Sequence, residues 1–191
     1  EYRRSIDVKP SKVEGWWEVP MGDFTGYLPD EGIRIWNEKK PPEIIENNDV
    51  WIDADLETQM LAVYRGSEIQ FLTLMSTAKA GHLTPLGIYN IYDKTTAWDL
   101  GSLEGAADAY FMERVPFVMH YSPRYAIHSA FWHDDFGTPA SHGCINLSVK
   151  DAQFVFEQVS PDLPIGWRYV KHSKKHPGSV LRVRNGEQKI T

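Results

Sequence analysis

The sequence predicts a mainly β protein, a mixed and mostly antiparallel β-sandwich with one short helix. Three observations lead to this fold class. Short apolar or alternating runs recur along the chain and are separated by turn residues, as in antiparallel sheets. Aromatic residues make up 13% of the 191 residues, and aromatic rings favour strands. A clear helical period occurs in one segment only, after residue 148.

The first 48 residues differ in pattern from the rest of the chain. Prolines interrupt any long regular element here, at positions Pro10, Pro20, Pro29, Pro41 and Pro42. Between them, residues 15–19 and 25–28 predict two short strands joined by a turn. We therefore expect residues 1–48 to form an N-terminal arm or the remnant of a preceding module.

From residue 49 the pattern becomes regular. The segments with a strand-like pattern are 50–56, 59–64, 68–76, 87–92, 117–121 and 125–128. Short turns between the first three predict an antiparallel meander. Residues 95–113 contain two glycines and several alanines without a clear period, so we expect a long loop there. Long loops in compact domains often cover or line a binding site.

One helix follows, and then the chain closes with strands. Ser148 and Asp151 form a start that is similar to a capping box, with Asp in place of Glu. Apolar residues then share one helical face: Val149, Ala152, Val155, Phe156 and Val159. Prolines at positions 161 and 164 end the helix. Residues 167–170 and 180–183 predict the two closing strands.

Charge is distributed unevenly along the chain. The formal net charge of −6 argues against a nucleic-acid partner. Residues 168–191 nevertheless hold seven Lys or Arg and one Glu, and residues 173–191 form a basic strand and tail. We expect this run to be a solvated edge, with contact to an anionic surface as the alternative. No stretch approaches the ~18 apolar residues of a membrane span, so a membrane would be reached only through an anchor outside this chain.

Cys144 is the only cysteine, and it lies in the run Ser-His-Gly-Cys-Ile-Asn of residues 141–146. His128 lies sixteen positions upstream, at the end of a predicted strand. A lone Cys with a distant His is typical of a thiol nucleophile with a separate base. Gly143 allows a sharp turn that points a backbone N–H at the site, as an oxyanion hole requires. Ser129 would orient the His128 ring through its carbonyl.

Two other interpretations apply to the same residues. A free cysteine is often a small buried apolar residue, although Ser141, His142 and Asn146 make these surroundings polar. A zinc site is the second alternative, because six possible ligands fall within 25 residues: His120, His128, His133, Asp134, His142 and Cys144. No pair has the spacing of a Cys-x-x-Cys site, and we expect neither a metal nor another cofactor. Tyr121 and Trp132 would form a groove wall or, equally, part of an aromatic core.

The run of residues 141–146, with His128 upstream, resembles the signature of L,D-transpeptidases of the YkuD type. Residues 51–66 resemble the first hairpin of that family. Residues 76–89 resemble its Ser-Thr-Gly…Thr-Pro-x-Gly-x-Tyr element, with Ala78 in place of the glycine. The resemblance covers roughly residues 49–172, and it implies a β-sandwich with a short helix after the nucleophile.

The resemblance also implies an enzyme that cross-links bacterial peptidoglycan outside the cytoplasmic membrane, in the periplasm or cell wall. Cys144 would attack the carbonyl of the diamino acid at the third position of a tetrapeptide stem. The terminal D-Ala would leave, and the thioester would pass its acyl group to the side-chain amine of another stem. Water as the acceptor, which makes an L,D-carboxypeptidase, and attachment of a protein to the wall are alternatives. A third alternative is a non-catalytic module that binds the cell wall.

The roles of individual residues follow from the same resemblance. His128 would be the base, and the backbone N–H groups of Gly143 and Cys144 would hold the oxyanion. The residues that would shape the substrate site are Ser141, His142 and Asn146, together with Tyr121 and Trp132. Carbapenem-type β-lactams would acylate Cys144.

Overall fold

A computed structural model describes residues 6–46, 48–102 and 109–187 of the chain. The chain divides into two compact units, Glu1–Glu38 and Lys39–Thr191. The first unit is a three-stranded antiparallel sheet of β1 (Lys9–Pro10), β2 (Trp16–Met21) and β3 (Phe24–Pro29). The hairpin predicted from the sequence is thus present as β2 and β3. Residues 39–48, which the sequence analysis grouped with the arm, belong to the second unit.

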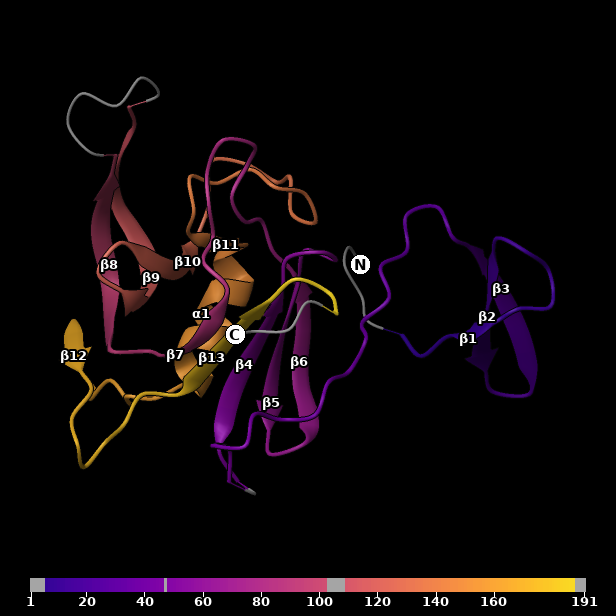
Figure 1. The fold of residues 1–191 in the computed structure, drawn as a ribbon, viewed down its shortest axis with the longest axis horizontal. Helices are drawn as coiled ribbons and strands as arrows, with labels where there is room; N and C mark the ends of the chain where they lie inside the picture. Colours follow the sequence, from indigo (N-terminus) through magenta and orange to yellow (C-terminus); the bar gives the residue numbers. More distant parts are fainter. Residues whose placement is uncertain (1–5, 47, 103–108, 188–191) are drawn as a thin grey trace. The chain divides into compact units, whose positions relative to one another are not determined.

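The second unit contains two five-stranded sheets (Figure 1). The first has strands β4 (Val50–Asp55), β5 (Met60–Arg65), β6 (Glu68–Leu74), β7 (Gly87–Asn90) and β13 (Val180–Arg184), in the order β6-β5-β4-β13-β7. The second has strands β8 (Asp93–Gly101), β9 (Phe111–Ser122), β10 (Tyr125–Ser129), β11 (Ile145–Leu147) and β12 (Tyr169–Lys171), in the order β11-β10-β9-β8-β12. The pairs β4–β13 and β10–β11 are parallel and the others antiparallel. The predicted mixed, mostly antiparallel β-sandwich is confirmed.

The helix α1 (Val149–Gln158) lies between the two sheets (Figure 1) and shares one apolar core with both. Ser148 Oγ accepts a hydrogen bond from the Asp151 N–H at 3.2 Å, as a capping start requires. The Asp151 carboxylate accepts a bond from the Thr73 hydroxyl of β6 at 2.8 Å, which ties the helix to the first sheet. Val149 is 38% exposed, so the buried face begins at Ala152.

Lys94 of β8 fixes the other end of this helix. Its side chain is buried, and its Nζ donates to the carbonyl oxygens of Phe156 and Val159, both at 2.5 Å. Carbonyls at a helix C-terminus lack partners within the helix, and a cation there is favourable. Burial lowers the pKa of the Lys94 ammonium to about 8. The helix that follows the Cys144 segment is therefore held at both ends.

The segment expected to be a loop at residues 95–113 is largely strand. Residues 93–101 and 111–122 form the antiparallel pair of β8 and β9, while residues 103–108, and with them much of the expected covering loop, lie outside the described residues. β8 is also paired with β12 on its other side. Its regularity comes from this pairing rather than from an apolar period, so the side-chain pattern did not show it. No described helix has the length and apolar character needed to cross a membrane.

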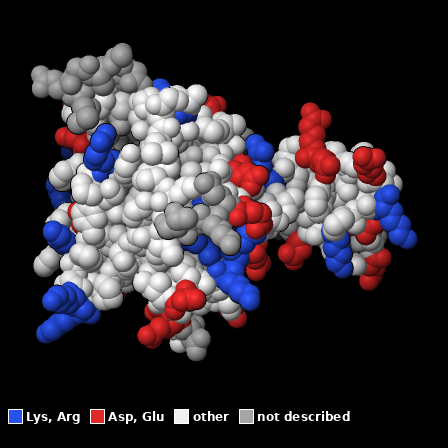
Figure 2. Space-filling model, in the orientation of Figure 1, with Lys and Arg blue, Asp and Glu red and all other residues white. Residues whose placement is uncertain are grey.

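The basic C-terminal run is not a solvated edge throughout. β13 lies between β4 and β7, and its parallel register places Arg182 opposite Asp53 and Arg184 opposite Asp55. Both arginines are buried and both contact Asp53, at 2.7 and 3.1 Å. The expectation of an exposed basic edge is therefore wrong for β13. On the face drawn in Figure 2, Lys and Arg atoms lie in separate clusters among Asp and Glu.

Replacing Asp53 by asparagine is expected to lower the free energy of unfolding by about 3–5 kcal/mol, because two buried arginines lose their shared counter-ion. Urea unfolding of the variant and the wild type measures the difference. The exposed Glu68→Gln on β6 is the matched control, with an expected change within about 0.5 kcal/mol. A loss for Asp53→Asn as small as that of the control would contradict this account.

Candidate active site

The parallel pairing of β10 with β11 brings together the two residues that the sequence singles out. The register places Ile127 opposite Ile145 and His128 opposite Asn146, so the next pair back is Ala126 with Cys144. Side chains alternate along a strand, so His128 and Cys144 project from the same face of the sheet. β11 was not predicted from the sequence. It explains how two residues sixteen positions apart reach one site.

His128 is buried and held in one tautomer. Its Nδ1 lies 2.8 Å from the carbonyl oxygen of Ser129, and a carbonyl can only accept, so Nδ1 carries the hydrogen. Nε2 is then the ring nitrogen that can take a proton. The Ser129 hydroxyl donates to the Pro116 carbonyl at 2.7 Å and anchors this strand end. Burial lowers the pKa of His128 to about 4, so the imidazole is neutral at neutral pH.

The Cys144 side chain packs beside Val115, Val118 and Ala126. Burial raises the pKa of its thiol, and a hydrogen bond with the Ala126 backbone opposes the shift. The protein without substrate therefore holds a neutral thiol and a neutral imidazole on one face. The thiol proton would therefore be transferred to His128 during the reaction and not before substrate binds.

Gly143 forms the turn before the nucleophile, with φ at +136°. A Cβ at this position would lie 2.6 Å from Cε1 of the Tyr125 ring and 2.8 Å from the Leu83 carbonyl oxygen, so a side chain does not fit. The Gly143 N–H donates to Ser141 Oγ at 3.0 Å, and Ser141 Oγ donates to the Cys144 carbonyl at 2.6 Å. In this conformation the Gly143 N–H is engaged within the turn, and the Ser141 hydroxyl braces that turn instead of facing a groove.

The other residues predicted to bind substrate, His142, Trp132 and Asn146, have different neighbours. The His142 ring stacks on Tyr110 at 4.6 Å between centroids, and Trp132 is 36% exposed with its ring 6.0 Å from that of His128. Asn146 is buried, with Nδ2 3.2 Å from His133 Nε2. Its Oδ1 has no hydrogen-bond partner among the described residues. Trp132 and Asn146 therefore lie beside His128, while the His142 ring packs against Tyr110.

Tyr121 is part of the aromatic core, and its buried hydroxyl has no hydrogen-bond partner among the described residues. It is buried with Tyr89 and Tyr125, whose ring centroids are 5.2 and 6.3 Å from its own. Burial, and after it the charge of Cys144, raises the pKa of the Tyr121 hydroxyl, so this group lies within electrostatic reach of the nucleophile. The aromatic-core alternative describes the ring, and a role of Tyr121 beside the substrate stays a prediction.

Two features of the site were missed by the sequence analysis. The Thr84 hydroxyl donates to the Gly143 carbonyl at 2.8 Å and holds the turn from outside. His120 on β9 lies with Nδ1 2.6 Å from Asp93 Oδ1 on β8. The Thr-Pro element around residue 84 was a local signal for the first. The second depends on the β8–β9 pairing, which no local pattern showed.

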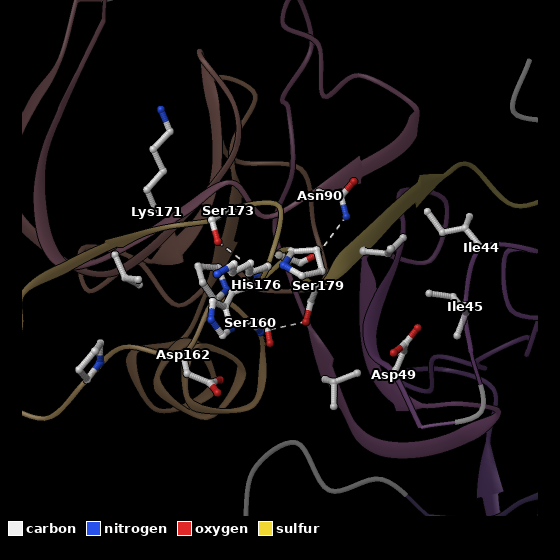
Figure 3. Close-up of a pocket in the computed structure, with 18 residues that line it drawn as sticks. Ile44, Ile45, Asp49, Asn90, Ser160, Asp162, Lys171, Ser173, His176 and Ser179 are labelled. Carbon is white, nitrogen blue, oxygen red and sulfur yellow. Dashed lines mark hydrogen bonds between the residues drawn. The ribbon is translucent and has the colours of Figure 1, made fainter.

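Within the described part of the chain, no three His, Cys, Asp or Glu side chains are grouped so that they could hold a metal ion. A cleft of about 670 Å³ lies between residues 44, 45, 49 and 50 on one side and the segments at 160–164 and 170–180 on the other (Figure 3). Its lining includes Asp49, Asp162, Lys171 and His176, but none of the predicted site residues. The candidate active site is therefore the Cys144 face and not this cleft.

Comparisons with known proteins point to one family. A family model described as the L,D-transpeptidase catalytic domain (YkuD) matches residues 49–175. YciB of Bacillus subtilis (strain 168), a protein named provisionally as an L,D-transpeptidase, is 27% identical over 159 residues, which is 79% of this chain and 73% of YciB.

Solved structures show the same fold. A crystal structure of an Enterococcus faecium L,D-transpeptidase matches 71% of this chain with a TM-score of 0.56 and 22% identity. L,D-transpeptidase 3 from Mycobacterium tuberculosis, in complex with a faropenem-derived adduct, matches 89% of this chain and 68% of its own, with a TM-score of 0.58 and 17% identity. The match spans 49% of the enterococcal chain.

Proposed function

This chain belongs to the YkuD family of L,D-transpeptidase catalytic domains, and from that premise we propose that it is a peptidoglycan L,D-transpeptidase with Cys144 as nucleophile. The observation that carries the proposal is the parallel pairing of β10 and β11, which puts Cys144 and His128 on one face. The neutral His128 ring, with its Nδ1 hydrogen fixed on the Ser129 carbonyl, supports its role as the base.

The first half-reaction acylates the enzyme. His128 Nε2 takes the thiol proton as Cys144 Sγ attacks the carbonyl carbon of the diamino acid at the third position of the donor stem. We assign the Cys144 N–H to the oxyanion, because the Gly143 N–H is engaged with Ser141. The bond to the terminal D-Ala nitrogen then breaks, and His128 returns its proton to that leaving amine. A thioester and free D-Ala result.

The second half-reaction transfers the acyl group. The side-chain amine of an acceptor stem attacks the thioester carbon, the C–S bond breaks, and an amide cross-link forms while Cys144 recovers its proton. Attack by water instead would release a tripeptide stem. Trp132, whose ring lies 6.0 Å from that of His128, and His142, two residues before Cys144, would line the path of the stems.

The same nucleophile gives a second expected substrate class. The Mycobacterium tuberculosis structure carries a faropenem-derived adduct. We extend this chemistry to the present chain: the strained carbonyl of a carbapenem-type β-lactam would acylate Cys144 as the stem carbonyl does. Since peptidoglycan lies outside the cytoplasmic membrane, the domain would work there, in the periplasm or cell wall.

Product analysis by mass spectrometry tests the proposed function. The protein is incubated with disaccharide-tetrapeptides that carry a diamino acid at the third position, in separate reactions for lysine-type and diaminopimelate-type stems. We expect a dimer that has lost one D-Ala. Tripeptide monomer alone would identify an L,D-carboxypeptidase. Unchanged substrate with both stem types would contradict an enzymatic role on peptidoglycan and favour the wall-binding module.

A further inference from the structure

We propose that His120, oriented by Asp93, is the base that removes a proton from the acceptor amine in the second half-reaction. This inference rests on the proposed function, because it assigns a residue to the acceptor side of that reaction. It gives the two histidines on this face separate tasks. His128 serves the thiol and the leaving D-Ala, and His120 serves the incoming amine.

The placement of His120 follows from strand register. Asp93 is opposite His120 across β8 and β9, and His120 is opposite Ala126 across β9 and β10. Ala126 is in turn opposite Cys144, one position before the Ile127–Ile145 pair. All four residues therefore form one row on one face. With neighbouring strands ~4.8 Å apart, the Cα atoms of His120 and Cys144 are about 10 Å apart.

Ala126 separates the two functional groups within this row. Its side chain is a single methyl, and it is buried with Val115 and Val118 in the apolar cluster against which Cys144 packs. An amine nitrogen placed over Ala126 would lie between a thioester carbon on Cys144 and the ring of His120. This arrangement suits a nucleophile that must reach the acyl group while its proton is taken from the other side.

The His120–Asp93 pair has the geometry of an oriented base. Because the Asp93 carboxylate accepts at 2.6 Å, Nδ1 of His120 carries a hydrogen, and Nε2 is left to accept a proton. Asp93 is buried and also accepts from the Tyr169 hydroxyl at 3.4 Å. The His120 ring lies against the rings of Tyr92 and Trp98, at 5.9 and 6.0 Å between centroids. Its position is thus fixed by three contacts.

The charged groups around His120 are compatible with this task. Asp93 faces it from β8, Tyr169 approaches that carboxylate from β12, and Lys171 is opposite Asp93 in the β12 register. His128 lies on β10. Burial is the main cause that lowers its pKa, and the charge of His120 is a smaller cause in the same direction.

The step balances in atoms and charge. An alkyl amine with a pKa of about 10.4 arrives as an ammonium ion at neutral pH and has no lone pair for attack. His120 Nε2 accepts one of its protons. The freed lone pair forms the new C–N bond, the C–S bond breaks, and the second amine proton passes to the departing sulfur. His120 then gives its proton to water, so the products are an amide, the Cys144 thiol and one released proton.

A cross-strand ion pair that only stabilises the β8–β9 hairpin is the alternative, and half-reaction kinetics distinguish it. In His120→Gln and Asp93→Asn, the first-turnover burst of D-Ala reports acylation, and the rate of dimer formation, with the ratio of dimer to tripeptide, reports transfer. We expect the burst rate of D-Ala within about twofold of wild type and transfer to the stem amine slower by about 10²-fold or more. The exposed His176→Gln is the matched control and should change neither.

An acceptor that needs no base provides the second readout. Hydroxylamine is uncharged at neutral pH, so its transfer rate in His120→Gln should equal that of wild type. With the stem amine, the deficit of the variant should shrink as pH rises toward the pKa of that amine. A structural role for His120 predicts neither the rescue nor this pH dependence.

The outcomes separate the inference from the proposed function. Equal slowing of the first-turnover D-Ala burst and of transfer, or an unchanged dimer-to-tripeptide ratio in His120→Gln, would overturn the role of His120 alone. Wild-type protein that releases D-Ala without forming a dimer would also overturn it, because no amine acceptor is used, while acylation of Cys144 would stand. Wild-type protein that releases no D-Ala would overturn the proposed function and this inference together.

Discussion

Replacing Cys144 by alanine is expected to abolish D-Ala release and dimer formation, with a loss of about 10⁶-fold, as found when other covalent catalysts lose their nucleophile. Cys144 is the only thiol in the chain, so no other cysteine can form the thioester. The substitution removes one atom, and the turn at residues 141–143 is held by hydrogen bonds that do not involve the thiol. Mass spectrometry of the products measures the loss.

Folding and adduct formation provide the controls for this variant. Thermal unfolding of Cys144→Ala should stay within a few degrees of wild type, as for a substitution that costs about 1 kcal/mol or less. A carbapenem should add its mass to the wild-type protein and not to the variant. D-Ala release by a folded Cys144→Ala protein at the wild-type rate would place the nucleophile elsewhere.

The parts of this fold with strong local patterns could be predicted from the sequence. Alternating runs with short turns gave β4, β5 and β6, and the capped apolar stripe gave α1. The pairing of Cys144 with His128 was also predicted, because each lies in a distinctive local segment. In these cases the information needed is carried by residues that are close together along the chain.

Features that depend on strand pairing could not be predicted in the same way. β8 and β11 show weak side-chain patterns of their own and exist through their neighbours. Asp53 contacts two arginines that lie far from it in the sequence, at separations of 129 and 131 positions. His120 and Asp93 are separated by 27 positions. Only the observed register brings such residues together.

Register also decides which face of a strand each residue occupies. His120 and Tyr121 are consecutive on β9, so their side chains leave the strand on opposite faces. The sequence analysis offered a groove wall or an aromatic core for the tyrosine and no catalytic role for the histidine, whereas pairing with Ala126 places the histidine in the row of Cys144. A search for candidate site residues in a β-sandwich therefore depends on knowing which positions of each strand share a face with the nucleophile.

Replacing His128 by glutamine is expected to slow acylation of Cys144 by about 10²–10⁴-fold at neutral pH, the usual contribution of a positioned general base. Burial raises the pKa of the thiol, so very little thiolate is present at neutral pH without a base. In wild type, the neutral Nε2 takes the proton as the Cys144 sulfur attacks. Glutamine fills a similar space but does not accept a proton in this range.

The acylation rate should depend on pH differently in wild type and in His128→Gln. Burial lowers the pKa of His128 to about 4, so the wild-type acylation rate should fall as pH drops through about 4 and hold a plateau through neutral pH. His128→Gln should lack this acid limb, and its rate should rise with pH as the thiol itself ionises. D-Ala release measures both profiles, and iodoacetamide, which has no titrating group, provides an independent probe of the thiol.

The exposed His172→Gln serves as the control and should keep the wild-type plateau. Coincident pH profiles for wild type and His128→Gln, in both D-Ala release and alkylation, would show that His128 does not exchange a proton with Cys144. A variant with a lost plateau but an unchanged dimer-to-tripeptide ratio would place His128 in acylation alone. That result would leave deprotonation of the acceptor amine to another group on the same face, which is the position that His120 occupies.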